Sequence, residues 1–240
     1  MGKEYIYDDQ QTLFGDKDVI GFGDETFYVK EIKRDLANEI IIKNHYSHKI
    51  YNATYIHLGV FFEDKLVGVL QYGYAMNPAS QDKVVADTKI DEYLELNRMW
   101  VDDIMPKNTE SKAISYSIKY IKKKFNNKIK WIQSFADERC GGLGVVYQAC
   151  SFDYYGEHKS DFWEFEGEVY HNIQMTVKKG TKRYTSSVKN LQENKHLAKR
   201  MSLRQFRYLF FIDRRYKSKA LLKRQDYPKR EEKQNEQCDI

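Results

Sequence analysis

The chain has 240 residues, of which 41% are hydrophobic and 15% aromatic, so it can bury the core of one sizeable domain, and disorder is not expected. Its three cysteines are scattered and form no CxxC pair, which argues against a disulfide framework and a zinc ribbon and favours a reducing compartment. No apolar run has the length of a membrane-spanning helix, and the charged N-terminus predicts no signal peptide.

The first third of the chain predicts a helix followed by an antiparallel hairpin. Apolar residues recur at helical spacing over 30–44, whereas two later runs alternate in the manner of strands and are split by the turn-length insert EDK. In chain order, the predicted elements are a polar lead-in over 1–25, a strand over 26–29, a helix over 30–44, the loop NHYSHK at 44–49, and strands over 55–62 and 66–72.

The middle of the chain predicts strands that alternate with helices. The expected elements are a strand over 93–101, a helix over 111–125, a strand over 131–136, a glycine-rich bend, a short helix carrying Tyr147, an aromatic strand ending at 155–156, and a hairpin over 162–175. This order predicts an α/β fold with a mixed, mostly antiparallel sheet flanked by helices.

The C-terminal quarter differs from the rest of the chain in charge. Residues 178–233 hold 19 Lys and Arg against five acids, a balance of +14, whereas the remainder carries −9. Such an asymmetry predicts an anionic partner, with nucleic acid as the first candidate. The spacing over 197–216 predicts an amphipathic helix with a cationic stripe. We expect phosphate contacts from the stripe and the basic residues after it, with a solvated surface face as the alternative: Arg200, Arg204, Arg207, Arg214, Arg215, Lys223 and Arg224.

These patterns predict four functional divisions: a lead-in (1–25), a catalytic domain (26–177), a basic helical DNA-contacting extension (178–230) and a flexible tail (231–240).

Polar side chains gather at the end of the strand over 131–136. Asp137 ends this strand, glycines follow, and Tyr147 lies on the next short helix, which is where α/β folds place their chemistry. His45 and His48 are three residues apart in a loop, so both imidazoles could meet one iron or zinc ion, or they are two exposed loop histidines.

The strand over 93–101 carries three polar residues among apolar ones. Glu95 and Asn97 are expected on one face and Arg98 on the other. A charge inside such a strand is costly unless it is paired, so Arg98 is either an ion-pair member or an anion binder.

The order of elements resembles the GNAT acetyltransferase fold, and four segments resemble the Mom family of phage DNA-modification proteins more specifically. They are NHYSHK (44–49), LGVFFEDKLVGVLQYG (58–73), ELNRMWVDDIMPKNTESKAISYSIKYIKK (95–123) and SFADERCGGLGVVYQACSFDYYG (134–156). The basic segment ending at Arg230 is similar too. The resemblance implies a phage enzyme that places an acetamido (methylcarbamoyl) group on N6 of adenine in duplex DNA, which protects phage DNA from host restriction in the bacterial cytoplasm. It also implies links to acetyl-CoA and iron.

The resemblance also implies roles for individual residues. Asp137 would deprotonate the adenine amine, hold the base edge or bind metal, unless it only caps a helix. Tyr147 would protonate a leaving thiolate, and Tyr46 would stack on the base or act in acid–base chemistry, unless both are core tyrosines. His45 would be a functional residue, and Ser134 would line the site or fill the sheet.

The cofactor expectation falls on the start of the helix at 111–125. A GNAT enzyme carries glycines in the preceding loop, but 102–110 has none, so backbone amides at the helix start would have to meet a phosphate. The donor is expected to be acetyl-CoA or another acyl or glycyl-type compound. Its expected contacts are Asn108, Ser111, Lys112 and Gly144.

Three functions stay open from the sequence. The first is DNA adenine modification, which requires the base to be flipped out of the duplex. The second is an ordinary N-acetyltransferase acting on a small amine or protein. The third is a DNA-binding protein without catalysis.

Overall fold

The computed structural model describes residues 19–140 and 142–229, so most of the predicted lead-in and the predicted tail lie outside the described residues. Nine strands form one sheet in the order β1-β2-β3-β4-β5-β6-β9-β7-β8. Every neighbouring pair is antiparallel except β5 and β6. The predicted α/β class with a mostly antiparallel sheet is therefore confirmed.

The strands are β1 (Gly21–Gly23), β2 (Phe27–Glu31), β3 (Thr54–Phe62), β4 (Lys65–Gly73), β5 (Tyr93–Val101), β6 (Trp131–Asp137), β7 (Asp153–Phe165), β8 (Glu168–His171) and β9 (Lys199–Phe211). The α-helices are α1 (Arg34–Asn44), α2 (Thr109–Lys124), α3 (Val145–Ala149) and α4 (Ser186–Glu193). Short 3₁₀ helices are η2 (Pro78–Lys83), η3 (Glu138–Cys140), η4 (Asn172–Thr176), η5 (Lys195–Leu197) and η6 (Arg214–Lys219).

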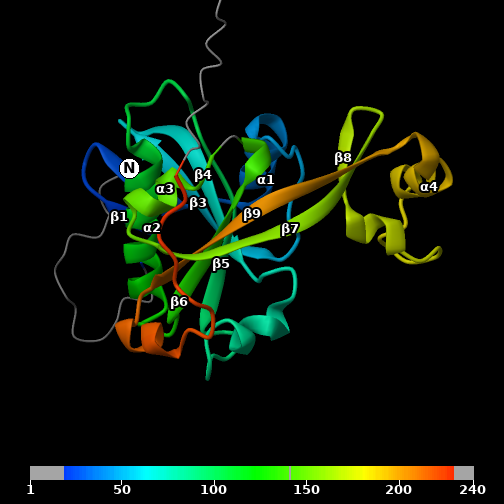
Figure 1. Ribbon diagram of the computed structural model, residues 1–240. Coiled ribbons are helices and arrows are strands. Elements are labelled where there is room, and N and C mark those ends of the chain that lie inside the picture. Colours follow the sequence, from blue (N-terminus) through cyan, green and yellow to red (C-terminus); the bar gives the residue numbers. More distant parts are fainter. Residues whose placement is uncertain (1–18, 141, 230–240) are drawn as a thin grey trace, which may run out of the picture.

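Helices cover both faces of the sheet (Figure 1). On one face, α2 buries Ala113, Ile114 and Ile121 in the main core, beside α3. On the other face, Ala37 and Ile41 of α1 pack with β4 in a separate small cluster. The central strands therefore bury apolar side chains on both faces of the sheet. Among the described residues, we find no helix with the length and apolar character needed to cross a membrane.

The predicted amphipathic helix over 197–216 is wrong, because most of it is strand β9. This strand lies between β6 and β7 and pairs with both of them. Its C-terminal half, from Phe206 to Phe211, is rich in aromatic residues that favour strands. Because packing covers both faces of this half, apolar residues stand at consecutive positions, and no clean strand alternation marks the sequence.

Strand β9 also shows that the sheet extends beyond the predicted catalytic division. β9 falls inside the predicted C-terminal extension, and β1 falls inside the predicted lead-in, yet both belong to the single sheet. The sheet therefore runs through the expected boundaries at 25/26 and 177/178, while the functional division remains a prediction.

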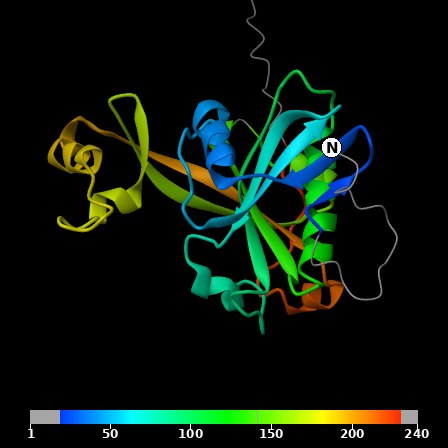
Figure 2. The ribbon, with the colours of Figure 1, turned by 180° about the vertical axis from the view of Figure 1, so that it is seen from behind.

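Two long strands carry an arm away from the body. The separate strands predicted at the end of the aromatic segment and at 162–165 form one continuous strand, β7, which pairs with β9 along both strands. Their distal halves leave the body and carry β8, η4 and α4, as Figures 1 and 2 show from opposite sides. We call residues 160–200 the arm.

Candidate active site

A cavity of about 560 Å³ lies where β5 and β6 part. These two strands pair only from Tyr93 to Glu95 on β5, and the rest of β5 diverges from β6. Along both strands, alternate residues join the core beneath α2, while the residues between them face the cavity. The cavity therefore opens on the face opposite α2, and loops after α1 and β4 and the β8 region of the arm line its rim.

A bulge in β5 directs neighbouring polar side chains into this cavity. Gln71 of β4 pairs with Arg98 and Tyr72 pairs with Leu96, so Asn97 is left as an extra residue. Asn97 and Arg98 consequently both line the cavity, and the expectation that Arg98 faces the other side is wrong. Consecutive polar residues inside an otherwise apolar strand were the available signal for this bulge.

Glu95 of β5 is one of the acidic groups that line the cavity. Its Oε2 accepts a hydrogen bond from Gln133 Nε2 at 2.6 Å, and its Oε1 accepts one from Asn97 Nδ2 at 2.9 Å. Burial raises the pKa of Glu95 to about 7, against these two hydrogen bonds and the nearby Arg98 and Arg207, which lower it. Glu95 can therefore gain or lose a proton near neutral pH.

Three arginines line the same cavity. Arg98 donates to the carbonyl oxygens of Asn97 at 2.7 Å and Lys49 at 3.2 Å, and burial lowers its pKa. Arg207 of β9 lies over the Phe135 ring at 5.2 Å, and burial lowers its pKa as well. The third arginine is Arg139 of η3, which the sequence did not single out.

Arg139 connects Asp137 to the aromatic wall of the cavity. Its Nε lies 3.0 Å from Asp137 Oδ1, its Nη2 lies 2.5 Å from Oδ2, and the backbone N–H of Arg139 donates to Oδ1. The guanidinium lies 4.5 Å from the centre of the Phe162 ring and 5.4 Å from that of Tyr46. Both oxygens of Asp137 are thus engaged, which suits a carboxylate that positions Arg139.

The NHYSHK loop brings Tyr46 and His48 to the cavity. Tyr46 is half exposed and lies against the ring of His45, with 4.3 Å between ring centres. His45 itself is buried, and burial, followed by Arg98, His48 and Arg139, lowers its pKa to about 4. The Ser47 backbone N–H donates to its Nδ1 at 3.1 Å, so the neutral ring carries its proton on Nε2.

The two histidines do not form a metal site with other described side chains. Nδ1 of His48 lies 2.8 Å from the Ile42 carbonyl oxygen and donates to it, while Nδ1 of His45 accepts from Ser47. Across residues 19–140 and 142–229, no group of three or more His, Cys, Asp or Glu side chains is placed to hold a metal ion. The residues do not fit a protein-held iron, and we derive no step through it.

Tyr147 and Ser134 lie on the opposite face of the sheet from Asp137. Tyr147 is buried in the main core, with its ring centre 5.6 Å from that of Phe152 and 5.4 Å from that of Tyr208. Ser134 is fully buried and donates to the Leu96 carbonyl oxygen at 3.4 Å. The structure therefore divides the predicted catalytic residues between two faces, and their roles stay predictions.

The predicted cofactor contacts also lie on the face that carries Tyr147. Asn108 precedes α2 in a left-handed conformation, with φ 70°, and its side chain caps nothing. Lys112 is ion-paired with Asp24 at 3.1 Å, and the acid Glu110 occupies the first turn. An acid and a neutralised lysine do not fit a phosphate cradle, so no step is derived through acetyl-CoA.

Gly144 has a structural reason to be glycine. It precedes α3 with φ +75°, and a Cβ atom here would lie 2.4 Å from the ring of Tyr208. The hydroxyl of Tyr208 donates to the Leu143 carbonyl oxygen, so the ring is held in place.

Most arginines predicted to bind DNA have carboxylate partners in the structure. Arg200 pairs with Asp161 at 2.5 Å, Arg204 with Glu138 at 2.9 Å, and Arg224 with Asp153 at 2.7 Å. Arg215 pairs with Asp213 in the same way. Arg214 and Lys223 are exposed on the segment after β9. The seventh predicted residue, Arg207, lines the cavity. The role of all seven in DNA binding stays a prediction.

Known proteins similar to this chain include acetyltransferases among solved structures. The ribosomal-protein-S5-alanine acetyltransferase of Vibrio fischeri is 12% identical with a TM-score of 0.46, covering 81% of this chain and 97% of its own. A probable GNAT-family acetyltransferase of Chromobacterium violaceum is 8% identical with a TM-score of 0.45, covering 80% and 86%.

A sequence relative is much closer. The protein named methylcarbamoylase mom of Escherichia phage Mu is 46% identical over 215 residues, which is 88% of this chain and 87% of that protein. The profile of the Mom protein family matches residues 26–229, which include every described element from β2 to η6. The chain therefore belongs to the Mom protein family.

Proposed function

We propose that this chain is a phage enzyme that attaches a methylcarbamoyl group to N6 of adenine in double-stranded DNA and thereby protects that DNA from host restriction. Membership of the Mom family and 46% identity to a protein named methylcarbamoylase support the reaction type. The observation that carries the proposal is the cavity between β5 and β6, where aromatic and cationic side chains surround Glu95.

The cavity suits a flat base that has been extruded from a duplex. Tyr46, Phe135 and Phe162 offer ring faces against which a base can stack, and stacking of this kind is worth about 1–3 kcal/mol per base. Flipping costs a few kcal/mol of lost stacking and pairing. Ring contacts within the cavity would offset that cost.

Glu95 is the group best placed to handle a proton of the exocyclic amine. Because its pKa is about 7, a large fraction is ionised at neutral pH and can accept a proton as the amine nitrogen forms its new bond. Arg98 and Arg139 lie at the same cavity and can stabilise negative charge that develops on the transferred group. Asp137 acts through Arg139 and is a positioning residue.

The donor of the group remains an acyl or glycyl-type compound, with acetyl-CoA as one member of that class. Tyr147 is buried on the other face of the sheet, and its role toward the leaving group is kept as a prediction without a position for the donor. Replacing Tyr147 with Phe would then reduce transfer without changing DNA binding.

The proposal is tested by expressing the protein in bacteria and analysing the nucleosides of genomic DNA by mass spectrometry. An adenine adduct bearing the group on N6, present with the protein and absent with an empty vector, is the expected result. The same DNA should resist restriction enzymes whose sites contain the modified adenine. Unmodified adenine from cells that hold folded protein would contradict the proposal, as would an acetylated protein or small amine in its place.

A further inference from the structure

The arm is an ordered platform beside the cavity. Val188 and Leu191 of α4 are buried, and Gln192 Nε2 donates to the carbonyl oxygens of Gln174 at 2.8 Å and Val177 at 3.0 Å. Asn190 of α4 also donates to Glu166, which lies in the turn between β7 and β8. These contacts fix the segment after η4 onto α4, so its position relative to the rest of the arm is defined.

The C-terminal part of the arm carries a dense positive charge. Residues 177–200 hold eight Lys and Arg against one acid. Half of these cations fall in one short segment, KKGTKR, which we call the basic loop (178–183). All four of its cationic side chains are exposed. The loop is a defined turn, because the Thr181 backbone N–H and hydroxyl both donate to the Lys178 carbonyl oxygen.

The basic loop differs from the other cations of the C-terminal quarter in its partners. Arg200, Arg204, Arg215 and Arg224 are each held by a carboxylate within 3 Å. No cation of the basic loop has an ion pair with any residue in the part of the chain that the structure describes. An unpaired cation can neutralise a phosphate directly, whereas a paired one must first give up its carboxylate.

The basic loop also has a defined relation to the cavity. The arm lines the cavity with Gln174 and with residues 167–171, from the β7–β8 turn through β8. Lys49 ties the NHYSHK loop to β8, with its Nζ 3.0 Å from both Glu168 Oε2 and the Val169 carbonyl oxygen. Arg183 is near enough to the cavity residue Tyr51 to lower the pKa of its phenol, which burial and Glu95 raise to about 12.

We propose that the basic loop binds the phosphate backbone of duplex DNA beside the target adenine, so that the arm holds the strand whose base enters the cavity. This inference rests on the proposed function and adds a partner surface to it. Duplex DNA fits because its phosphates repeat at close spacing, so several adjacent lysines can each displace a counterion. Gly180, with φ +87° and open space around its Cβ position, lets the loop present its cations at a tight turn.

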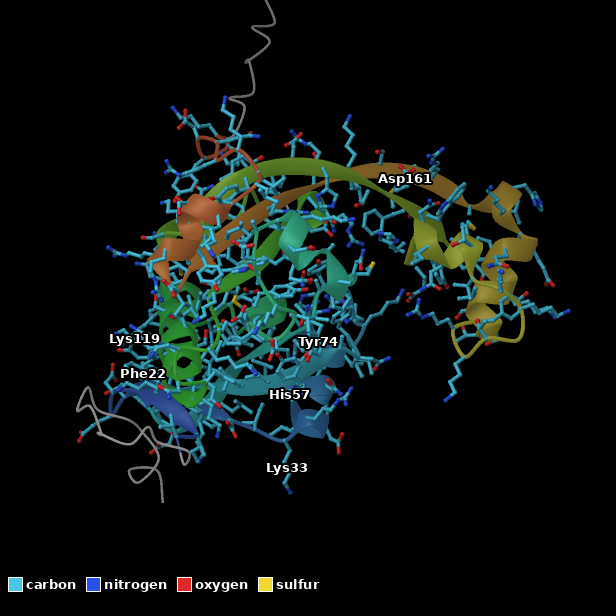
Figure 3. The ribbon with its side chains drawn as sticks, turned by 90° about the horizontal axis from the view of Figure 1, so that it is seen from below. Phe22, Lys33, His57, Tyr74, Lys119 and Asp161 are labelled. Atoms are coloured by element: carbon cyan, nitrogen blue, oxygen red, sulfur yellow. The ribbon has the colours of Figure 1, made fainter. Side chains whose placement is uncertain are left out.

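The test compares the salt dependence of DNA binding between two triple variants. The first is Lys178→Ala with Lys179→Ala and Lys182→Ala. The control is Lys33→Ala with Lys65→Ala and Lys122→Ala, which removes three exposed body lysines that likewise have no ion pair among the described residues. Figure 3 shows Lys33 projecting from the body, whereas Asp161 marks the strand that enters the arm.

The measurement is the slope of log binding constant against log salt on a duplex containing adenine, between about 50 and 200 mM. The arm variant should lower the slope by about three relative to wild type, since each phosphate contact contributes about one. The control should leave the slope within about one of wild type. Unchanged melting temperatures of both variants show that the fold is kept.

Two results separate this proposal from the proposed function. If wild type produces modified adenine but the arm variant keeps the wild-type slope, the basic loop is not the phosphate contact and the modification reaction stands. If the slope falls as expected while wild type produces no modified adenine, the loop is a DNA surface and the proposed reaction is wrong. A fall in slope in both triple variants would also contradict the proposal, because binding would then follow total charge.

Discussion

Glu95 occupies the most unusual electrostatic position among the described residues of the cavity. Its two oxygens accept from the amides of Gln133 and Asn97, yet burial still raises its pKa to about 7. The bulge at Asn97 has a second effect, because it aims Arg98 at the same space. A carboxyl group poised between its two protonation states, with cations nearby, is suited to proton transfer.

Replacing Glu95 with Gln should stabilise the fold above pH 7. Because the folded pKa of about 7 lies above the ordinary value of 4.5, the folded state binds the proton more tightly than the unfolded state. Stability of the wild type therefore falls as pH rises from about 4.5 to 7, by up to about 3 kcal/mol. The gain in the variant should be clear at pH 8 and small at pH 5 in urea unfolding. An equal gain at both values would contradict the assignment.

His45 should make the fold sensitive to acid in the opposite sense. Its folded pKa of about 4 lies below the ordinary 6.5, so its contribution is present above pH 6.5 and is lost as pH falls toward 4. At pH 5 the expected loss is about 2 kcal/mol relative to pH 7. His45→Asn keeps an acceptor for the Ser47 N–H. Between pH 7 and pH 5, the stability of this variant should fall by about 2 kcal/mol less than that of the wild type. Identical acid sensitivity of variant and wild type in denaturant titrations would exclude this role.

At the scale of the elements, β9 determines how the sheet is assembled. It joins β6 to β7, and its aromatic half contributes Phe206 and Tyr208 to the core beneath α2. On the other face of the strand, Arg207 points into the cavity. Because β9 contributes side chains to both the core and the cavity wall, disrupting this strand should also disrupt the cavity.

Truncating Phe206 should therefore be severe. Its side chain is 1% exposed, so Phe206→Ala should cost about 3–5 kcal/mol of unfolding free energy. Leu197→Ala is the matched control, because Leu197 is 67% exposed and should change stability by no more than about 0.5 kcal/mol. Mild effects of both changes in thermal or urea unfolding would contradict the position of Phe206 in the core.

Periodicity predicted the body of the sheet but not its last strand. The hairpin β3–β4, strands β5 and β6 and helix α2 begin and end within two residues of the expected positions. Each of them has one dominant pattern, either alternation or helical spacing. β9 has neither, because both faces of its aromatic half are covered, and its arginines happened to repeat at helical intervals.

The sequence indicated which segments of the chain lie near the candidate site, but not which face of the sheet each residue occupies. Asp137, Tyr46 and His48 come to one cavity, because a strand end and the loop after α1 converge there. Tyr147 lies across the sheet from them, since α3 packs into the core. Arg139 and the bulge at Asn97 depend on three-dimensional pairing that a single sequence does not display.

In the molecule as a whole, the exposed cations of the basic loop and the candidate active site lie on different parts of the structure. The cavity holds its own arginines among aromatic rings, whereas the exposed lysines of the basic loop lie on the arm. The arm and the body both line the cavity, so a duplex bound by the arm as proposed would lie next to the opening between β5 and β6. Under this proposal, different parts of one sheet bind the phosphate backbone and modify the base.

The proposed role of the cavity is tested most directly by the amount of modified adenine that Glu95→Gln produces beside wild type and a Glu39→Gln control. Glu39 is an exposed glutamate on α1, away from the residues that line the cavity. All three proteins should bind duplex DNA alike. Modified adenine should fall at least about a hundredfold in Glu95→Gln and stay at the wild-type level in Glu39→Gln, as expected when a general base is lost. Wild-type levels of modified adenine in folded Glu95→Gln would contradict the central claim that this cavity performs the reaction.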